Sequence, residues 1–465
     1  MMRFRRIWMG VGGTLVMAAG IWGAPADRTV PPEPVAAAAA LPSLREQAAL
    51  RQEWLRLRLE KVLPAVMRRQ GVAMWLVASG EYNEDPVFFS LVSPTELSAH
   101  RRSILAFFDR GDAGVERLVL GGSDSGGLYT PYKDAELAKT IPRERLQAEL
   151  LRKLLEERQP ASIAVNISRN APLADGLSAG DREALEDALG PKWAARLVRA
   201  ENLPLEYLSV RVPEMLPAYG KLMEVAHHLI RRAFSGEVIQ PGRTTTTDVV
   251  WWLRQEAQRL GAGAWFHPTV DVQRRGQGGE FKPPDDTETL IQPGDVLHVD
   301  LGLTGIGLAT DTQHMGYVLR PGETDAPAGL RQALAVGNRL QDIVLARTRP
   351  GRTGNEVLAD ALAAMKEAGI TGAVYCHPVG DHGHGAGPMI GRWDRQTPVP
   401  GAGDRVILPD TWWSIELYAA AKVPEWDGQE VRMMLEEDAA LGAEGIRWVL
   451  PRQERFHLVG PSPAK

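Results

Sequence analysis

The spacing of apolar residues along the chain predicts alternating helices and strands in the first half. Between Ser43 and Gln70 apolar residues recur at helical spacing among many arginines and glutamates, which predicts one long amphipathic helix. Further on, strand-like runs are expected at Met74–Ala78, Val87–Val92 and Arg117–Leu120, and helices near Asp134–Gln159 and Asp181–Leu189. This alternation predicts a smaller α/β domain over residues 43–213.

The second half contains an internal repeat. Pro241-Gly242-Arg243-Thr244 recurs as Pro350-Gly351-Arg352-Thr353, and helical patterns stand on both sides of each copy. The preceding helices are expected at Gly220–Phe234 and Gly329–Ala346, and the following helices end near Gly261 and Gly369. Capping by Thr247 or Asp248 in the first copy and by Asn355 in the second is expected. The repeat predicts a duplicated α+β unit over residues 216–460, with a site at its pseudo-symmetric centre.

The first copy leads into a strand pair that carries two aspartates. Asp295–Leu303 and Leu308–Val318 are strand-like and flank a glycine-rich turn. A turn centred between Gly305 and Ile306 would place Asp300 opposite Asp311, where the two charges repel unless a cation lies between them. An aspartate that caps a strand or pairs with an arginine is the alternative interpretation.

The second copy leads into a strand pair that carries two glutamates. Trp412–Ala420 and Glu430–Leu441 are strand-like, and the turn sequence Pro424–Gly428 joins them, so Glu416 and Glu436 fall on neighbouring strands. Strand alternation sends Glu437 to the face opposite Glu436, so only one of the two can be a ligand of the same site. The alternative for the acidic run at residues 436–438 is a solvated edge.

A segment rich in histidine and glycine provides the third element. Residues 377–388 read His-Pro-Val-Gly-Asp-His-Gly-His-Gly-Ala-Gly-Pro, with histidines at positions 377, 382 and 384. Glycines let the backbone approach closely, as a loop must when it places an imidazole beside a metal ion. We expect a metal site here rather than a hydrogen-bonded loop.

These motifs resemble those of the pita-bread metallopeptidases, which include aminopeptidase P, prolidase, methionine aminopeptidase and the related creatinase. The family signature is Asp, Asp, His, Glu, Glu in chain order, with the two aspartates eleven residues apart and the histidine in a Gly-His-x-x-Gly context. Five residues fit this signature: Asp300, Asp311, His384, Glu416 and Glu436. The resemblance spans about Leu216 to Val459. It implies a pita-bread fold with an internal pseudo-two-fold repeat, and an N-terminal domain like that of creatinase.

The resemblance also implies roles for these residues. Asp311 and Glu436 would bridge two divalent ions. Asp300 would complete the ligands of one ion, and His384 and Glu416 would complete those of the other. A water molecule activated by both ions would attack the scissile carbonyl, and Glu416 would carry the proton to the leaving amine. Four carboxylates and one imidazole form a hard donor set, so Mn²⁺ is the first expectation, with Co²⁺, Fe²⁺ or Zn²⁺ as alternatives.

Two histidines of aminopeptidase P and prolidase have no counterpart in this chain. One should precede the first aspartate, but no histidine occurs between His267 and His298. The other should follow the metal histidine by seven residues, where this chain has Gly391. His298, on the strand face of Asp300, and His382 are candidate catalytic substitutes, and structural hydrogen bonding is the alternative for each.

Composition narrows the class of protein. The 465 residues are enough for two domains, and 53 Lys and Arg against 58 Asp and Glu leave no basic surface typical of nucleic-acid binding. Cys376 is the only cysteine, so no intrachain disulfide can form.

The N-terminal residues predict export. Arginines precede an apolar stretch and then small residues, which predicts a signal peptide over residues 1–26, followed by a Pro/Ala-rich linker over residues 27–42. The mature chain would then be periplasmic or secreted, with no membrane segment. An uncleaved N-terminal anchor is the alternative.

The resulting hypothesis is a dinuclear metal-dependent aminopeptidase or dipeptidase that hydrolyses short peptides, Xaa-Pro bonds among them. The resemblance also allows a homodimer. Two rivals stay open. One is a creatinase-like hydrolase of a small C–N substrate, and the other is a metal-binding relative that acts as a binding protein without catalysis.

Overall fold

The computed structural model describes residues 40–277 and 288–460. The predicted signal peptide and nearly all of the predicted linker lie outside the described residues. Within those two ranges, no helix combines the length and the apolar character that a membrane crossing requires.

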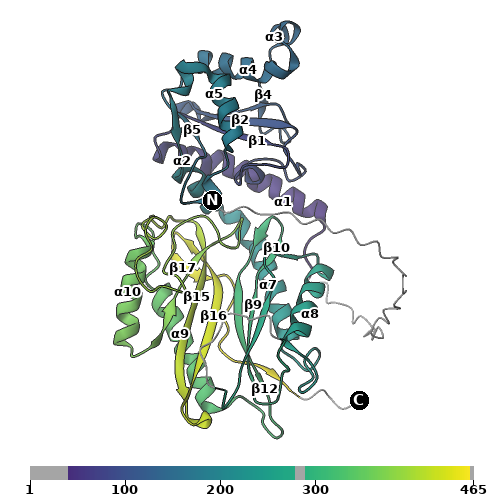
Figure 1. Ribbon diagram of the computed structural model, residues 1–465, viewed down its shortest axis with the longest axis vertical. Helices are drawn as coiled ribbons and strands as arrows, with labels where there is room; N and C mark the ends of the chain where they lie inside the picture. Colours follow the sequence, from purple (N-terminus) through teal and green to yellow (C-terminus); the bar gives the residue numbers. More distant parts are fainter. Residues whose placement is uncertain (1–39, 278–287, 461–465) are drawn as a thin grey trace, which may run out of the picture. The chain divides into compact units, whose positions relative to one another are not determined.

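The first half forms a six-stranded sheet with helices around it (Figure 1). Its helices are α1 (Leu44–Leu57), α2 (Leu63–Arg69), α3 (Ala135–Thr140), α4 (Arg143–Arg158), α5 (Ala179–Ala194) and α6 (Asn202–Ser209). Its strands, given in sheet order, are β4 (Thr130–Pro131), β3 (Val115–Leu120), β2 (Arg102–Asp109), β1 (Met74–Gly80), β5 (Ile163–Val165) and β6 (Leu197–Arg199). The sheet mixes antiparallel pairs such as β1–β2 with parallel pairs such as β1–β5. This is the α/β arrangement that the sequence predicts.

Two sequence predictions in this half need correction. The long helix is present, but a π-helical turn at Arg58–Val62 separates α1 from α2. Val87–Val92 is no strand: a 3₁₀ turn occupies Phe88–Ser90, because the Asp85 carboxylate accepts the backbone N–H of Val87 at 3.0 Å and starts a turn.

The second half is built on a nine-stranded sheet with four helices, α7 (Leu216–Ala233), α8 (Thr246–Arg259), α9 (Ala328–Leu345) and α10 (Gly354–Glu367). The central strands follow the order β13 (Thr371–Val374), β15 (Thr411–Val423), β16 (Gln429–Gly442), β12 (Thr312–Val318), β9 (Val296–Leu301) and β8 (Thr269–Gln273). The remaining strands of this sheet are β14 (His377–Val379), β17 (Gly445–Trp448) and β18 (His457–Val459). A separate small sheet contains β7 (Gly263–Ala264), β10 (Leu303–Gly305) and β11 (Leu308–Ala309). The domain boundaries at residues 213 and 216 stay a prediction.

The repeat in the sequence is a repeat in structure. In both copies the glycine of the Pro-Gly-Arg-Thr motif has a left-handed backbone, with φ of 79° at Gly242 and 85° at Gly351. Each glycine N–H donates to an isoleucine carbonyl, that of Ile291 at 2.7 Å and that of Ile407 at 2.9 Å. Figure 1 shows α9 beside β15 and α7 beside β9, and α10 and α8 lie next to α9 and α7. The two copies therefore supply the two halves of the large sheet and their covering helices.

The caps of α8 and α10 lie earlier than predicted. Thr245 caps α8, and its hydroxyl and backbone N–H exchange hydrogen bonds with Asp248. Thr353 caps α10 in the same way with Glu356. A capping box needs an acidic side chain three residues after the cap, which selects these threonines over Thr247, Asp248 or Asn355.

The register of the aspartate hairpin also differs from the prediction. Gly305 pairs with Leu308, so the turn consists of Ile306 and Gly307, both with positive φ. Along the same hairpin Asp300 pairs with Gln313 and not with Asp311. Moving the centre of a turn by one residue moves every cross-strand partner by two, which accounts for the error.

Candidate metal centre

A row of acidic and amide side chains crosses four neighbouring strands of the nine-stranded sheet. The register aligns Glu416 on β15 with Glu436 on β16, Glu436 with Gln313 on β12, and Gln313 with Asp300 on β9. Residues directly paired in this way point to the same face, with Cβ atoms about 5 Å apart. The sheet alone therefore brings three of the predicted ligands to one face.

Asp311 and the histidine-rich segment complete the cluster. Three groups each have donor atoms within 4.8 Å of one another: Asp300, Asp311 and Glu436; His377, Glu416 and Glu436; and Asp311, His377 and His384. The structure thus brings together all five predicted ligands and adds His377.

His377 is a member of the cluster that the sequence argument did not select as a ligand. Its Nδ1 lies 3.0 Å from the carbonyl oxygen of Pro378, and a carbonyl only accepts, so Nδ1 carries the hydrogen. Its Nε2 is buried without a hydrogen-bond partner, 3.5 Å from Asp311 Oδ2 and 3.4 Å from Glu436 Oε1. With the hydrogen on Nδ1, the neutral ring directs the lone pair of Nε2 towards the carboxylate oxygens. This arrangement suits a cation bound by both the imidazole and the carboxylates.

His384 lies at the exposed edge of the cluster. Its ring is nearly perpendicular to that of His377, with centroids 4.7 Å apart, and Trp265 lies on another side at 5.0 Å. Burial, followed by the neighbouring His377, lowers the pKa of His384. A neutral imidazole is the form that binds a metal ion.

The two predicted substitute histidines have different surroundings. His382 belongs to none of the donor groups and instead lines a cavity beside Arg51 and Arg58. His298 is buried on β9, with Nδ1 3.1 Å from Asp271 Oδ2 and Nε2 2.9 Å from Gln313 Oε1. Neither ring reaches the carboxylates directly, so a catalytic role for either stays a prediction.

Gln313 connects His298 to the acidic row. The Gln313 Nε2 group donates to Glu416 Oε1 at 2.6 Å and to Glu436 Oε2 at 2.9 Å. Its Oε1 accepts a hydrogen bond from His298 Nε2, and Asp271 lies beside the other ring nitrogen of His298. The chain from Asp271 through His298 to Gln313 positions both glutamates, as residues behind metal ligands do.

Asp438 has a comparable positioning role. It is fully buried, accepts the Tyr219 hydroxyl at 2.6 Å and accepts the backbone N–H of Asp311 at 3.2 Å. The run at residues 436–438 is therefore no solvated edge, because all three side chains are buried by the packing on both faces of β16. Alternation places Asp438 with Glu436 and sends Glu437 to the other face, as predicted.

The electrostatics of the cluster fit a cation. Burial, followed by repulsion from Glu436, raises the pKa of Asp300, Asp311 and Glu416 well above the usual range. Within residues 40–277 and 288–460, His377 is the only side chain in ion-pair distance of any of these carboxylates, and it reaches Asp311, Glu416 and Glu436 but not Asp300. Asp300 Oδ1, Asp311 Oδ1 and His377 Nε2 are buried without hydrogen-bond partners. Divalent ions bind to closely spaced oxygen and nitrogen atoms of this kind, which have no other partner.

Gly391, which the sequence argument compares with a family histidine, lies where no side chain fits. Its φ is 78°, and a Cβ atom at this position would lie 2.2 Å from the carbonyl oxygen of Val374. No side chain fits without a backbone shift. The other missing histidine would fall between His267 and His298, a stretch that includes residues 278–287, which lie outside the described residues.

Residues 220–448 match the family model described as metallopeptidase family M24. This part of the chain belongs to family M24. The M24 domain has the pita-bread fold, and the smaller α/β half precedes it, as the sequence predicts. Membership supports a metal-dependent peptidase. A comparison with curated proteins gave no match.

Solved structures show the same fold over nearly the whole chain. X-Pro aminopeptidase from Thermotoga maritima MSB8 is 16% identical, with a TM-score of 0.58 over 85% of this chain and 99% of its own. Xaa-Pro dipeptidase from Bacillus anthracis is 16% identical, with a TM-score of 0.56 over 89% of this chain and 99% of its own. The N-terminal domain of FACT complex subunit SPT16 from chickpea, Cicer arietinum, is 10% identical, with a TM-score of 0.51 over 88% of this chain and 98% of its own. At these identities the likeness shows the fold and leaves the substrate open.

Proposed function

We propose that the chain is a dinuclear metal-dependent aminopeptidase or dipeptidase that hydrolyses short peptides, including peptides with Xaa-Pro bonds. One observation carries the proposal: four carboxylates and two imidazoles from five separate segments converge in the M24 domain, with buried donor atoms that have no other partner. The titles of the similar structures, which name X-Pro aminopeptidase and Xaa-Pro dipeptidase, motivate the substrate class.

Two divalent ions would be held by the donors already described. Asp311 and Glu436 each belong to two of the donor groups, which suits bridging positions between two ions. Asp300 would complete the ligands of one ion, and Glu416 and His384 would complete those of the other. His377 would be an additional ligand. The oxygen-rich set favours Mn²⁺, then Co²⁺, Fe²⁺ or Zn²⁺. When bound, such ions acidify a water molecule and polarise the scissile carbonyl.

Glu416 would be the residue that moves the proton. Its Oε1 is held by Gln313, while its Oε2 faces the cluster, 3.9 Å from His377 Nε2. A carboxylate that faces the cluster can take up a proton and release it again. We infer that Oε2 takes the proton of the attacking water and delivers it to the leaving amine.

Peptide hydrolysis by the loaded protein tests the proposal. Protein incubated with Mn²⁺ would be offered a library of dipeptides and Xaa-Pro peptides, with products identified by mass spectrometry. Glu416→Gln should lower kcat/KM by about 10²- to 10⁴-fold, the usual contribution of a general acid or base. Glu430→Gln is the matched control, because Glu430 is an exposed residue of β16, the strand next to the one that carries Glu416.

A binding protein is the second candidate. Gly391 leaves no room for one family histidine, and the same fold occurs in the FACT complex subunit SPT16. Stoichiometric metal binding without turnover of any library peptide would favour this candidate and overturn the peptidase. Turnover of a small C–N substrate alone would favour the creatinase-like rival, although all five predicted ligands lie together here.

We also propose export to the periplasm or the medium. The support is the predicted signal peptide at residues 1–26. Mass spectrometry of the mature protein should find an N-terminus after Ala26. Recovery of the full-length chain in the membrane fraction would instead favour an uncleaved anchor. Light scattering of the mature protein checks the expected homodimer.

A further inference from the structure

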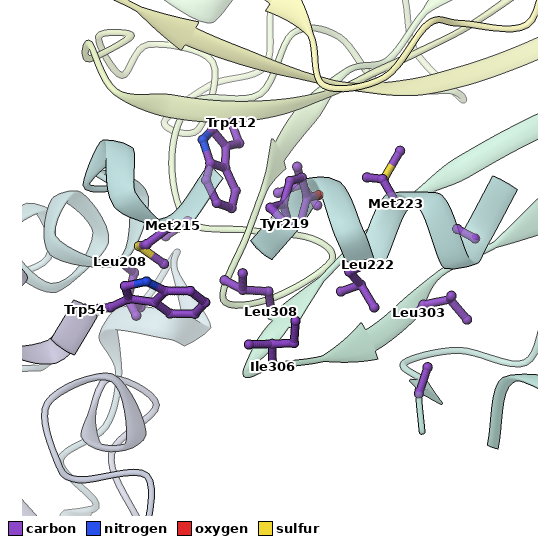
Figure 2. Packing of buried hydrophobic residues seen from close by; sticks show 14 of the residues in the cluster. Trp54, Leu208, Met215, Tyr219, Leu222, Met223, Leu303, Ile306, Leu308 and Trp412 are labelled. Atoms are coloured by element: carbon purple, nitrogen blue, oxygen red, sulfur yellow. The ribbon is translucent and has the colours of Figure 1, made fainter. Parts of the chain in front are cut away.

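An apolar cluster joins the smaller α/β half to the M24 domain. Figure 2 shows Trp54 of α1 and Leu208 of α6 with Ile306 and Leu308 of the β10–β11 hairpin and Trp412 of β15. All five side chains are buried in the same hydrophobic cluster. Close-packed side chains of this kind have few alternative arrangements, so polar groups that cross the junction are held in fixed positions.

A buried ionic cluster crosses the same junction. Arg58, the first residue of the π-helical turn after α1, donates from Nη1 to Asp381 Oδ2 at 3.1 Å. Arg211, which follows α6, lies 3.4 Å from the same oxygen. Other donors of the two guanidinium groups bond to the carbonyl oxygens of Tyr207, at 2.6 Å, and Leu208. The backbone of α6 therefore holds both arginines, and both reach one carboxylate of the histidine-rich segment.

This arrangement leaves Asp381 little freedom to move. Both arginines are buried, and burial alone would raise the pKa of Asp381, but Arg211 and Arg58 lower it, so the carboxylate is ionised. A buried ion pair resists separation, because separation leaves an uncompensated charge away from water. Gly380 permits the close approach, since a Cβ atom at this position would lie 1.9 Å from Arg211 Nη2.

The segment around Asp381 connects two imidazoles of the metal centre. Asp381 follows His377 by four residues and precedes His384 by three. The backbone N–H of Gly385 donates to the Pro378 carbonyl at 2.7 Å, and His377 Nδ1 lies 3.0 Å from the same oxygen. The His377 ring and the backbone next to His384 thus share one acceptor, and a displacement of Asp381 would move both imidazoles.

We propose that Arg58 and Arg211 are positioning residues of the metal centre, which act through Asp381 to hold His377 and His384 against the four carboxylates. The inference rests on the proposed function, which places two divalent ions at this centre. Within residues 40–277 and 288–460, the donor groups of the centre contain no residue of the smaller α/β half. That half therefore contributes to metal affinity without contacting the ions.

A substitution in the smaller half tests this assignment. Arg58→Leu leaves Arg211 as a partner of Asp381 and keeps apolar atoms at the junction, so the fold should persist. It should weaken Mn²⁺ binding by about 10- to 100-fold, as the loss of groups that support metal ligands does. Arg58→Lys, which keeps the charge but not the planar fork, should recover part of the affinity. Calorimetric titration of metal-free protein with Mn²⁺ measures all three affinities.

A second buried ion pair provides the matched control. Glu256 of α8 is buried, pairs with Arg232 at 2.8 Å and belongs to none of the donor groups. Glu256→Gln should lower the free energy of unfolding, as the loss of a buried pair does, and should leave the Mn²⁺ affinity unchanged. An equal loss of affinity in this control would overturn the inference, because general destabilisation would then account for the effect.

Hydrogen exchange in metal-free protein gives a local measurement. Amides of residues 377–388 should lose protection in Arg58→Leu and keep it in Glu256→Gln, since only the first change releases this segment. An unchanged Mn²⁺ affinity in Arg58→Leu would overturn the inference, even if the wild type hydrolyses peptides. Weakened Mn²⁺ binding in Arg58→Leu, with no peptide hydrolysis by the wild type, would support the positioning role while the peptidase proposal fails.

Discussion

Glu436 and Glu437 are neighbours on β16, yet their carboxylates lie in environments of opposite character. Glu436 faces a row of other carboxylates, where His377 Nε2 is the one imidazole nitrogen in ion-pair distance within the described residues. Glu437, on the other face, lies 3.0 Å from His227 Nε2 and 2.6 Å from His314 Nε2. Both side chains are buried.

The difference shows two ways of stabilising a buried carboxylate. Burial alone would raise the pKa of Glu437, but His227 and His314 lower it to about 2, so its charge is satisfied by protein donors. The network continues from His314 Nδ1 to His457 Nε2 at 3.0 Å. On the Glu436 face donors are too few for the carboxylates, and a metal ion is the group that completes that face. The Glu437 cluster also brings together three residues that could bind a metal ion, His227, His314 and Glu437, but their side chains already pair with one another.

The largest effect should come from exchanging the two glutamates for glutamine, one at a time. Glu436→Gln should lower kcat/KM by more than about 100-fold and reduce bound metal, since even groups that only support a ligand contribute about 10- to 100-fold. Glu437→Gln should keep its metal but lower the free energy of unfolding by about 1–3 kcal/mol. Metal analysis measures the bound ions, and urea titration measures the free energy of unfolding. Equal metal loss in the two variants would remove the contrast between the faces.

Metal removal should act through the Glu436 face alone. Chelation should lower the free energy of unfolding, by about 2.7 kcal/mol relative to protein in free metal at 100 times Kd. This loss of stability on chelation should be absent in Glu436→Gln and present in Glu437→Gln. Thermal unfolding with and without chelator measures it, and a metal-independent Tm in the wild type would contradict a metal centre.

The Gln313 connection should have a smaller effect on the same face. Gln313→Leu removes the donor that holds Glu416 and Glu436, and should weaken metal affinity by about 10- to 100-fold. His298→Leu should produce part of this loss, because His298 orients Gln313. Calorimetric titration with Mn²⁺ measures the affinity. Gln258→Leu, on an exposed position of α8, is the control and should leave it unchanged.

The effect that is smallest for a single step, here one pH unit, concerns acidification of the Glu437 face. Burial lowers the pKa of His457 to about 3, so between its unfolded pKa near 6.5 and about 3 the unfolded chain binds the extra proton. Stability therefore falls as the pH falls through this window, by up to about 1.4 kcal/mol per pH unit. His457→Gln should flatten the slope. Urea titrations of metal-free wild type and variant check this, and parallel pH profiles would contradict it.

Local sequence patterns predicted much of the fold. The repeated Pro-Gly-Arg-Thr motif, the four helices around it and the glutamate hairpin followed from periodicity and turn residues, and Glu416 does pair with Glu436. The hairpin of Asp300 was misjudged, because apolar alternation does not distinguish two turns that differ by one residue.

Other parts of the site could not be predicted from local patterns. His377 stands seven residues before His384 in a segment already noted for its histidines, but its approach to Glu436 depends on the pairing of β14 with β15. The partners of Glu437 come from positions 227 and 314, and the pairing of Arg58 with Asp381 joins residues 323 positions apart.

The sequence by itself determined the strand faces, the repeat and the set of carboxylate and histidine donors, because side-chain alternation and turn chemistry act over a few residues. Only the tertiary structure decided the aspartate register, the place of His377 and the shared pairing of Arg58 and Arg211 with Asp381. These depend on which distant segments pack together, and the free energy of that packing is shared over many contacts that no local pattern contains.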